Sequence, residues 1–162
     1  MRKITLLAFV LLAGMMMSME YFVDPNNEFI YAVLDGFEAT YNEDDGSLSV
    51  FNPQYNVVIN IGKISEPVEG LELGVLVDEI GKNLERSGFQ ILSRNDRDFL
   101  GYPASTFEGL TSQDGIAVHV EFTVIEVPQK GYYLIVAATP DESYNELVLL
   151  LLNAKQMLMF IE

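Results

Sequence analysis

The 162-residue chain has no cysteine and no tryptophan, and its only histidine is His119. The absence of cysteine excludes a disulfide framework, a thiolate nucleophile and a cysteine-ligated metal site. Because one histidine would have to serve any catalytic triad or zinc site, these chemistries find little support. The sequence also lacks a G-x-S-x-G motif, a P-loop and a G-x-G-x-x-G motif. We therefore expect no cofactor, and catalysis is not favoured.

Basic residues are scarce as well. Nine Lys and Arg stand against 24 Asp and Glu, which gives a formal net charge of −15. A surface this acidic repels the phosphate backbone, so the sequence predicts no nucleic-acid partner. Solubility is the simplest role of the charge, and attraction of cations or of a basic partner is the alternative.

Residues 1–18 have the pattern of a secretory signal peptide. Arg2 and Lys3 precede an apolar run over residues 4–17, which is too short to cross a bilayer as a helix. We therefore expect an exported bacterial protein, periplasmic or secreted, with no membrane span once the leader is cleaved. The sequence leaves open the cleavage site, and it also leaves open a leader that is retained as a membrane tether.

The rest of the chain predicts strands, a helix, more strands and a final helix. Strands are indicated where apolar residues alternate with polar ones, as in residues 37–41, 57–61 and 116–124. Residues 132–138 are apolar on both faces, which predicts a central strand covered on each side. The first helix should begin near Leu71 and end at Gly88, with Gly88 as a left-handed cap. Residues 95–98 are expected to form a charged turn.

The final helix is predicted to start at a capping box over residues 139–142 and to run to the C-terminus. Its expected inward stripe is Tyr144, Leu147, Leu151, Ala154, Leu158 and Ile161. The apolar run 147–152 is wider than one stripe needs. Either the helix is deeply covered, which is the favoured interpretation, or Leu149 and Leu152 form a patch for a partner.

This order of elements resembles the PsbP-like superfamily. The resemblance rests on the helix ended by Gly88, on Gly101-Tyr102-Pro103-Ala104 opening a strand, on Gly131-Tyr132-Tyr133-Leu134, and on the Thr139-Pro140 helix start. It implies an α+β fold, an α/β/α sandwich with an antiparallel sheet between helices. The superfamily includes Ran-binding nuclear-import regulators and exported bacterial proteins. Its members mostly bind other proteins and share no catalytic residue set.

The resemblance divides the chain into three parts. A single PsbP-like domain is expected over residues 35–162, after the leader and an unmatched lead-in segment over residues 19–34. The lead-in segment is interpreted as a strand that covers a sheet edge.

Two groups of residues are candidates for metal binding. His119 and Glu121 share one face of a strand and are suited to holding a metal or to acting as a base and its orienting group. Glu43, Asp44 and Asp45 crowd one turn, and clustered carboxylates are typical of calcium sites. Their spacing does not fit an EF-hand, and a solvated hairpin turn is the simpler interpretation.

The leading hypothesis is an exported, non-catalytic interaction module, accessory to an envelope or secreted protein assembly. The alternatives are a small metal-assisted enzyme and a cation or small-ligand carrier, both using the face of His119 and Glu121.

Overall fold

The computed structural model describes residues 20–64 and 71–161. The leader expected over residues 1–18 lies outside the described residues. In chain order the elements are β1 (Glu20–Val23), β2 (Phe29–Val33), β3 (Glu38–Asn42), β4 (Ser47–Asn52), β5 (Val57–Lys63), α2 (Leu73–Arg86), β6 (Gln90–Asp96), β7 (Ala104–Gln113), β8 (Ile116–Val127), β9 (Gly131–Pro140), the 3₁₀ turn η1 (Asp141–Ser143), α3 (Tyr144–Lys155) and β10 (Leu158–Phe160). No helix among them is long and apolar enough to span a membrane.

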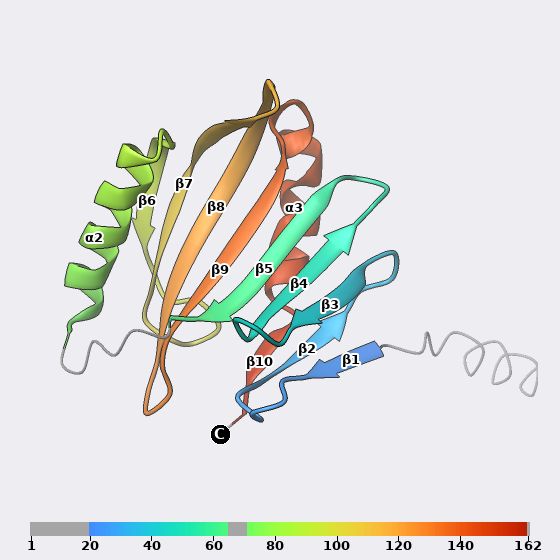
Figure 1. Cartoon of the computed structure of the whole chain (residues 1–162), viewed down its shortest axis with the longest axis vertical. Helices are drawn as coiled ribbons and strands as arrows, with labels where there is room; N and C mark the ends of the chain where they lie inside the picture. Colours follow the sequence, from blue (N-terminus) through green and yellow to red (C-terminus); the bar gives the residue numbers. More distant parts are fainter. Residues whose placement is uncertain (1–19, 65–70, 162) are drawn as a thin grey trace, which may run out of the picture.

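Seven strands form one antiparallel sheet in the order β3-β4-β5-β9-β8-β7-β6. The predicted central strand, β9, is indeed the middle strand, and it pairs with β5 and β8. The helices lie on opposite faces, with α2 in front of the sheet and α3 behind it in Figure 1. The predicted α+β class, an antiparallel sheet with helices packed on it, is confirmed.

The α3 face holds the larger core. Alternate residues of the central strands point into it, among them Ile59, Ile125 and Ile135, all fully buried. From the helix, Leu151 and Ala154 close this core. We expect such a packed layer from strands whose every second residue is apolar, because the strand places those residues on one face.

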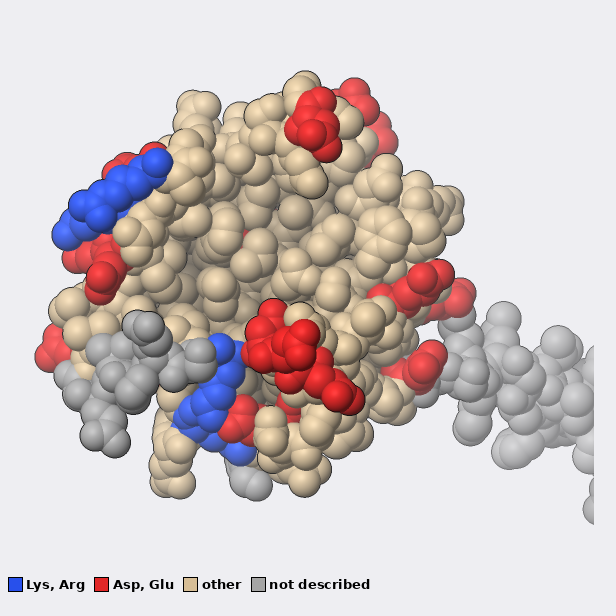
Figure 2. Space-filling model, viewed as in Figure 1, with Lys and Arg blue, Asp and Glu red and all other residues tan. Residues whose placement is uncertain are grey.

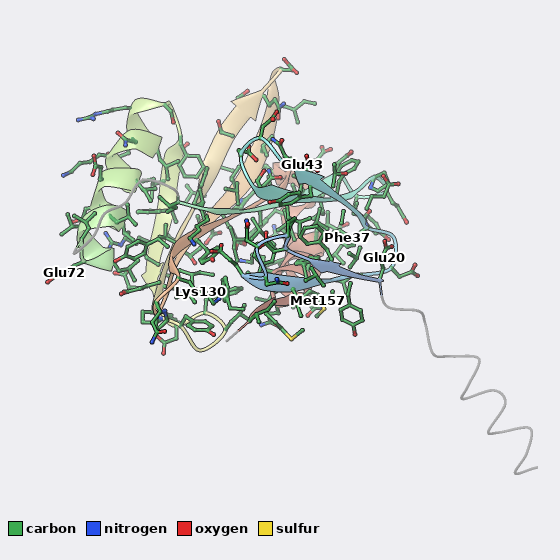
Figure 3. The ribbon with its side chains drawn as sticks, turned by 60° about the horizontal axis from the view of Figure 1, so that its bottom comes forward. Glu20, Phe37, Glu43, Glu72, Lys130 and Met157 are labelled. Carbon is green, nitrogen blue, oxygen red and sulfur yellow. The ribbon has the colours of Figure 1, made fainter. Side chains whose placement is uncertain are left out.

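A second, three-stranded sheet covers the lower end of the α3 face. Its order is β1-β2-β10, so the residues before the main sheet pair with the end of the chain. Tyr31 of β2 is fully buried, and its hydroxyl donates to the carbonyl of Ala154 over 2.8 Å. Phe37 and Met157, which also pack in this core, lie beside the small sheet in Figure 3.

The α2 face holds a smaller core beneath α2. Leu76 and Val77 of the helix pack with Phe107 and Val124 of the sheet. The helix ends as predicted at Gly88, which has a φ of +87°. The amide of Gly88 donates to Glu85 and the amide of Phe89 to Leu84, which satisfies the last helical carbonyls.

The predicted capping box of the final helix is wrong. Thr139 and Pro140 still belong to β9, where Thr139 pairs with His119 of β8, and α3 begins only at Tyr144. Because Thr139 is held in β9 by strand pairing, it cannot cap the helix, which starts later in the chain. The helix also does not run to the C-terminus, because Leu158 is buried in β10 instead.

The strand expected over residues 37–41 is confirmed as β3, shifted by one residue, but two details of the sheet differ from the predictions. In the strand expected over residues 37–41, Phe37 is buried but precedes β3, and Ala39 is exposed because β3 is an edge strand. The charged turn expected over residues 95–98 begins late, because β6 continues to Asp96 along β7. There the carboxylate of Asp96 accepts a hydrogen bond from the hydroxyl of buried Ser105.

Candidate binding surface

The single histidine lies on the α3 face, in a closed polar cluster. His119 is 5% exposed, and its ring nitrogens lie 3.0 Å from Glu108 Oε1 and 3.4 Å from Asp141 Oδ1. The ring of Tyr144 stacks on it, with 3.4 Å between ring centroids. These contacts connect β7, β8 and the start of α3. We therefore interpret the cluster as one that stabilises the fold.

Glu121 shares this face but does not pair with His119. Its carboxylate forms an ion pair with the ammonium of buried Lys155 and accepts a hydrogen bond from the hydroxyl of Tyr144 over 3.3 Å. Burial and the charges of Glu121 and Glu108 raise the pKa of Tyr144, so its hydroxyl stays protonated and donates. The geometry therefore orients Glu121 toward α3 and not toward the histidine ring.

Neither candidate metal group brings three metal-binding side chains together in the described part of the chain. Across residues 20–64 and 71–161, no three His, Cys, Asp or Glu side chains are placed to hold a metal ion. In the turn of Glu43, Asp44 and Asp45, the carboxylate of Asp45 accepts hydrogen bonds from the amide and hydroxyl of Ser47. Those bonds lower the pKa of Asp45. The residues close the β3–β4 turn, and cation binding has no support from this geometry.

The outer side of α3 is not covered, contrary to the expectation for residues 147–152. Leu149 is 69% exposed and Leu152 is 40% exposed, whereas Leu151 is buried on the inner side. Leu149 and Leu152 thus lie on an apolar helix surface that faces solvent.

The most distinctive surface is one that the sequence did not indicate, on the half of the α2 face that α2 leaves open. Among the described residues, the helix packs on β6 and β7 and on the start of β9 at Tyr132 and Leu134, and it leaves the same face of β4, β5 and the end of β9 uncovered. No charged residue points to this face from these three strands. Its residues are Ser47, Ser49, Phe51, Val58, Asn60, Gly62, Leu134, Val136 and Ala138.

This open area is hollowed into a groove, which we define by two neighbouring cavities. The first, of about 770 Å³, lies between α2 and the β5–β9 pair, and Asn60, Leu134 and Val136 line it. The second, of about 370 Å³, includes Val58 and Ala138 and reaches the β7–β8 turn. Figure 2 shows uncharged atoms over the middle of this face and acidic atoms gathered near the β3–β4 turn.

The prediction that β9 is covered on each side therefore holds at Tyr132 and Leu134, which pack beneath α2, and is wrong at Val136 and Ala138. Ile135 is fully buried on the α3 face, but Val136 and Ala138 are only half-buried on the other. In sequence, the groove is marked only by the absence of charge from both faces of β9, and this signal does not tell which face a helix leaves open.

No protein-family model matches the sequence, and no curated protein matches it either. Solved structures do match over nearly the whole chain. The cyanobacterial PsbP of Synechocystis is 13% identical, with a TM-score of 0.61 and coverage of 91% of this chain and 96% of that one. The Ran-binding Mog1p of Saccharomyces cerevisiae is also 13% identical, with a TM-score of 0.62 and coverage of 90% and 97%. LpqN of Mycobacterium tuberculosis, involved in cell envelope biogenesis, is 11% identical, with a TM-score of 0.56 and coverage of 91% and 88%.

The chain has the PsbP/Mog1-like fold. The fold that the sequence resemblance implied is confirmed. At these identities the likeness is one of fold alone, so no site residue is transferred from these proteins, and the groove must be interpreted from its own residues.

Proposed function

We propose that this PsbP/Mog1-like chain is an exported, non-catalytic interaction module, accessory to an envelope or secreted protein assembly, and that the groove is its binding surface. The observation that carries the proposal is the uncharged, hollowed face of β4, β5 and β9 beside α2. A chain with 24 acidic residues has ample charge to cover a surface that only meets water. An extended uncharged area is instead typical of a surface that a partner covers.

Other features support parts of this proposal. The leader-like residues 1–18 support export. Mog1p binds Ran, and LpqN takes part in envelope biogenesis, so proteins of this fold include binding and envelope proteins. The contacts of His119 with Glu108 and Asp141 leave it buried, which argues against an exposed catalytic or metal-binding face.

The partner surface is tested by capture from cross-linked native cells, with two matched variants. Val136→Glu places a carboxylate in the groove, and Leu149→Glu places one on the outer side of α3, across the sheet. We expect Val136→Glu to abolish capture of a specific partner and Leu149→Glu to retain it, while circular dichroism and thermal unfolding show both variants folded. Loss of capture with Leu149→Glu alone would instead assign the interaction to α3.

Export is tested separately. Fractionation of the native cells should recover the protein outside the cytoplasm, and sequencing of its N-terminus should show whether the first 18 residues or so are removed. A full-length chain confined to the cytoplasm, or the capture of no specific partner at all, would refute the corresponding part of the proposal.

A further inference from the structure

The groove is long and follows one strand pair. In the register of β5 and β9, Gly62 lies opposite Leu134, Asn60 opposite Val136, and Val58 opposite Ala138. The first two pairs line the larger cavity, and the third lines the smaller one. At about 3.3 Å per residue, the groove floor is roughly 15–20 Å long. That is the length of about five or six residues of extended peptide.

The floor of the groove presents side chains, and not free backbone groups, to an occupant. The strands β4, β5, β9 and β8 are all paired with neighbours, so their amides and carbonyls are engaged within the sheet. An occupant therefore does not add a strand here. It meets apolar side chains, and it meets the amide of Asn60, which is exposed in the larger cavity.

Acidic groups line both cavities around this uncharged floor. Asp45 and Glu79 line the larger cavity, and Asp114 lines the smaller one. Within the described residues, none of these three carboxylates forms an ion pair. Their negative charge is therefore left for an occupant to neutralise.

The one lysine beside the groove does not offset these carboxylates. Lys63 lines the larger cavity, but its ammonium forms an ion pair with Glu28 and lies 5.8 Å from the centroid of the Tyr133 ring. Tyr133 points to the α3 face, so the charge of Lys63 is directed away from the groove.

Deepening the proposed function, on which this step rests, we infer that the groove takes an extended peptide segment of a partner, apolar in its middle and carrying Lys or Arg at each end. The apolar residues cover the floor, and the basic ends meet Asp45 and Glu79 at one end and Asp114 at the other. The net charge of −15 favours the approach of such a segment and disfavours acidic or phosphorylated ones.

The test uses the purified protein and three labelled ten-residue peptides, measured by fluorescence anisotropy. All share an alternating Val and Ser centre, and their ends carry two Arg, two Gln or two Glu on each side. We expect the Arg-ended peptide to bind at least about fivefold more tightly than the Gln-ended one, with an affinity that falls as salt rises. The Glu-ended peptide should show no binding.

Variants of the protein then test where the basic ends of the peptide bind. The double variant Asp45→Asn with Glu79→Gln should weaken binding of the Arg-ended peptide by roughly fivefold and leave the Gln-ended peptide unchanged. The control Glu20→Gln with Glu146→Gln removes two exposed carboxylates outside both cavities, one from β1 and one from α3, and should change neither.

Equal affinity for the Arg-ended and Gln-ended peptides would overturn this inference, as would equal weakening by the control. In that case the interaction module still stands if the Val136→Glu variant loses its partner in cells. A captured partner whose cross-linked segment is neutral or acidic would likewise overturn the inference and leave the proposed function intact.

Discussion

The two faces of the main sheet are built from the same strands, yet one is closed and the other is half open. On β9, Ile135 is fully buried and its neighbour Val136 is half-buried. The α3 face is covered by a helix and by the sheet of β1, β2 and β10, whereas the open face has α2 over one half only. Apolar character alone therefore does not tell which side of a strand belongs to the core. Which other elements pack on a face decides it, and we propose that a partner covers the apolar residues left open.

The largest expected effect separates the faces at two neighbouring valines of β5. Val57 is fully buried on the α3 face, and Val58 is half-buried in the groove. We expect Val57→Ala to lower the free energy of unfolding by about 2–3 kcal/mol, from two lost carbons and the cavity they leave. Val58→Ala should cost less than about 1 kcal/mol. Urea unfolding of both variants measures the difference.

The pair is well matched, because both substitutions are the same and lie in one strand, so any change in strand propensity is similar. Equal losses would mean that the open face is packed as firmly as the closed one, which would count against an unoccupied groove. Peptide binding should respond in the opposite order, with Val58→Ala the more damaging variant.

The pattern of the closed face was largely predictable from sequence. The alternation of Val57, Ile59 and Ile61 predicted their burial, and Gly88 predicted the end of α2, because both signals are local. The capping-box prediction was wrong because of a contact that the local sequence does not show. Thr139 pairs with His119 of β8, and this long-range pairing outweighs the local preference for a cap.

The open face was not predictable, because what covers a strand is a property of the whole fold. An apolar strand looks the same in sequence whether a helix lies over it or stops short of it. The periodicity of the last helix gave a wrong C-terminal end for a related reason. Leu158 continues the apolar spacing of the helix, but it is buried in β10, which pairs with β2.

A smaller effect is expected at Thr139, in the polar part of the closed face. Its hydroxyl is buried and, among the residues described, has no hydrogen-bond partner. Thr139→Val removes this unsatisfied group while keeping the shape of the side chain, so we expect stabilisation by about 1 kcal/mol. Thermal unfolding should show a midpoint a few degrees higher, on the order of 3–5 °C.

The matched control is Thr123, which is equally buried on the same face. Its hydroxyl forms a hydrogen bond with that of Thr106 over 2.9 Å. Thr123→Val should therefore destabilise by about 1 kcal/mol. If both variants lower the midpoint, the hydroxyl of Thr139 is hydrogen-bonded and the prediction is wrong.

The smallest effect concerns Glu28, which joins the small sheet to the main sheet on the closed face. Burial opposes ionisation of its carboxyl, but hydrogen bonds from Lys63 and Tyr133 outweigh it and lower the pKa below the ordinary value of 4.5. A lowered folded-state pKa stabilises the protein above pH 4.5, and this contribution is lost as the pH falls through the folded-state value.

Glu28→Gln removes the charge and keeps an acceptor for the hydroxyl of Tyr133. Because the ion pair with Lys63 is partly exposed, we expect the variant to be less stable by about 0.5–1 kcal/mol at pH 7. The gap should close as the pH falls below 4.5, in urea unfolding followed from pH 7 to pH 3. Glu38→Gln, which removes an exposed carboxylate of β3, is the matched control for the change in net charge. A gap that persists at pH 3, where both side chains are uncharged, would mean that the charge of Glu28 is not what stabilises this face.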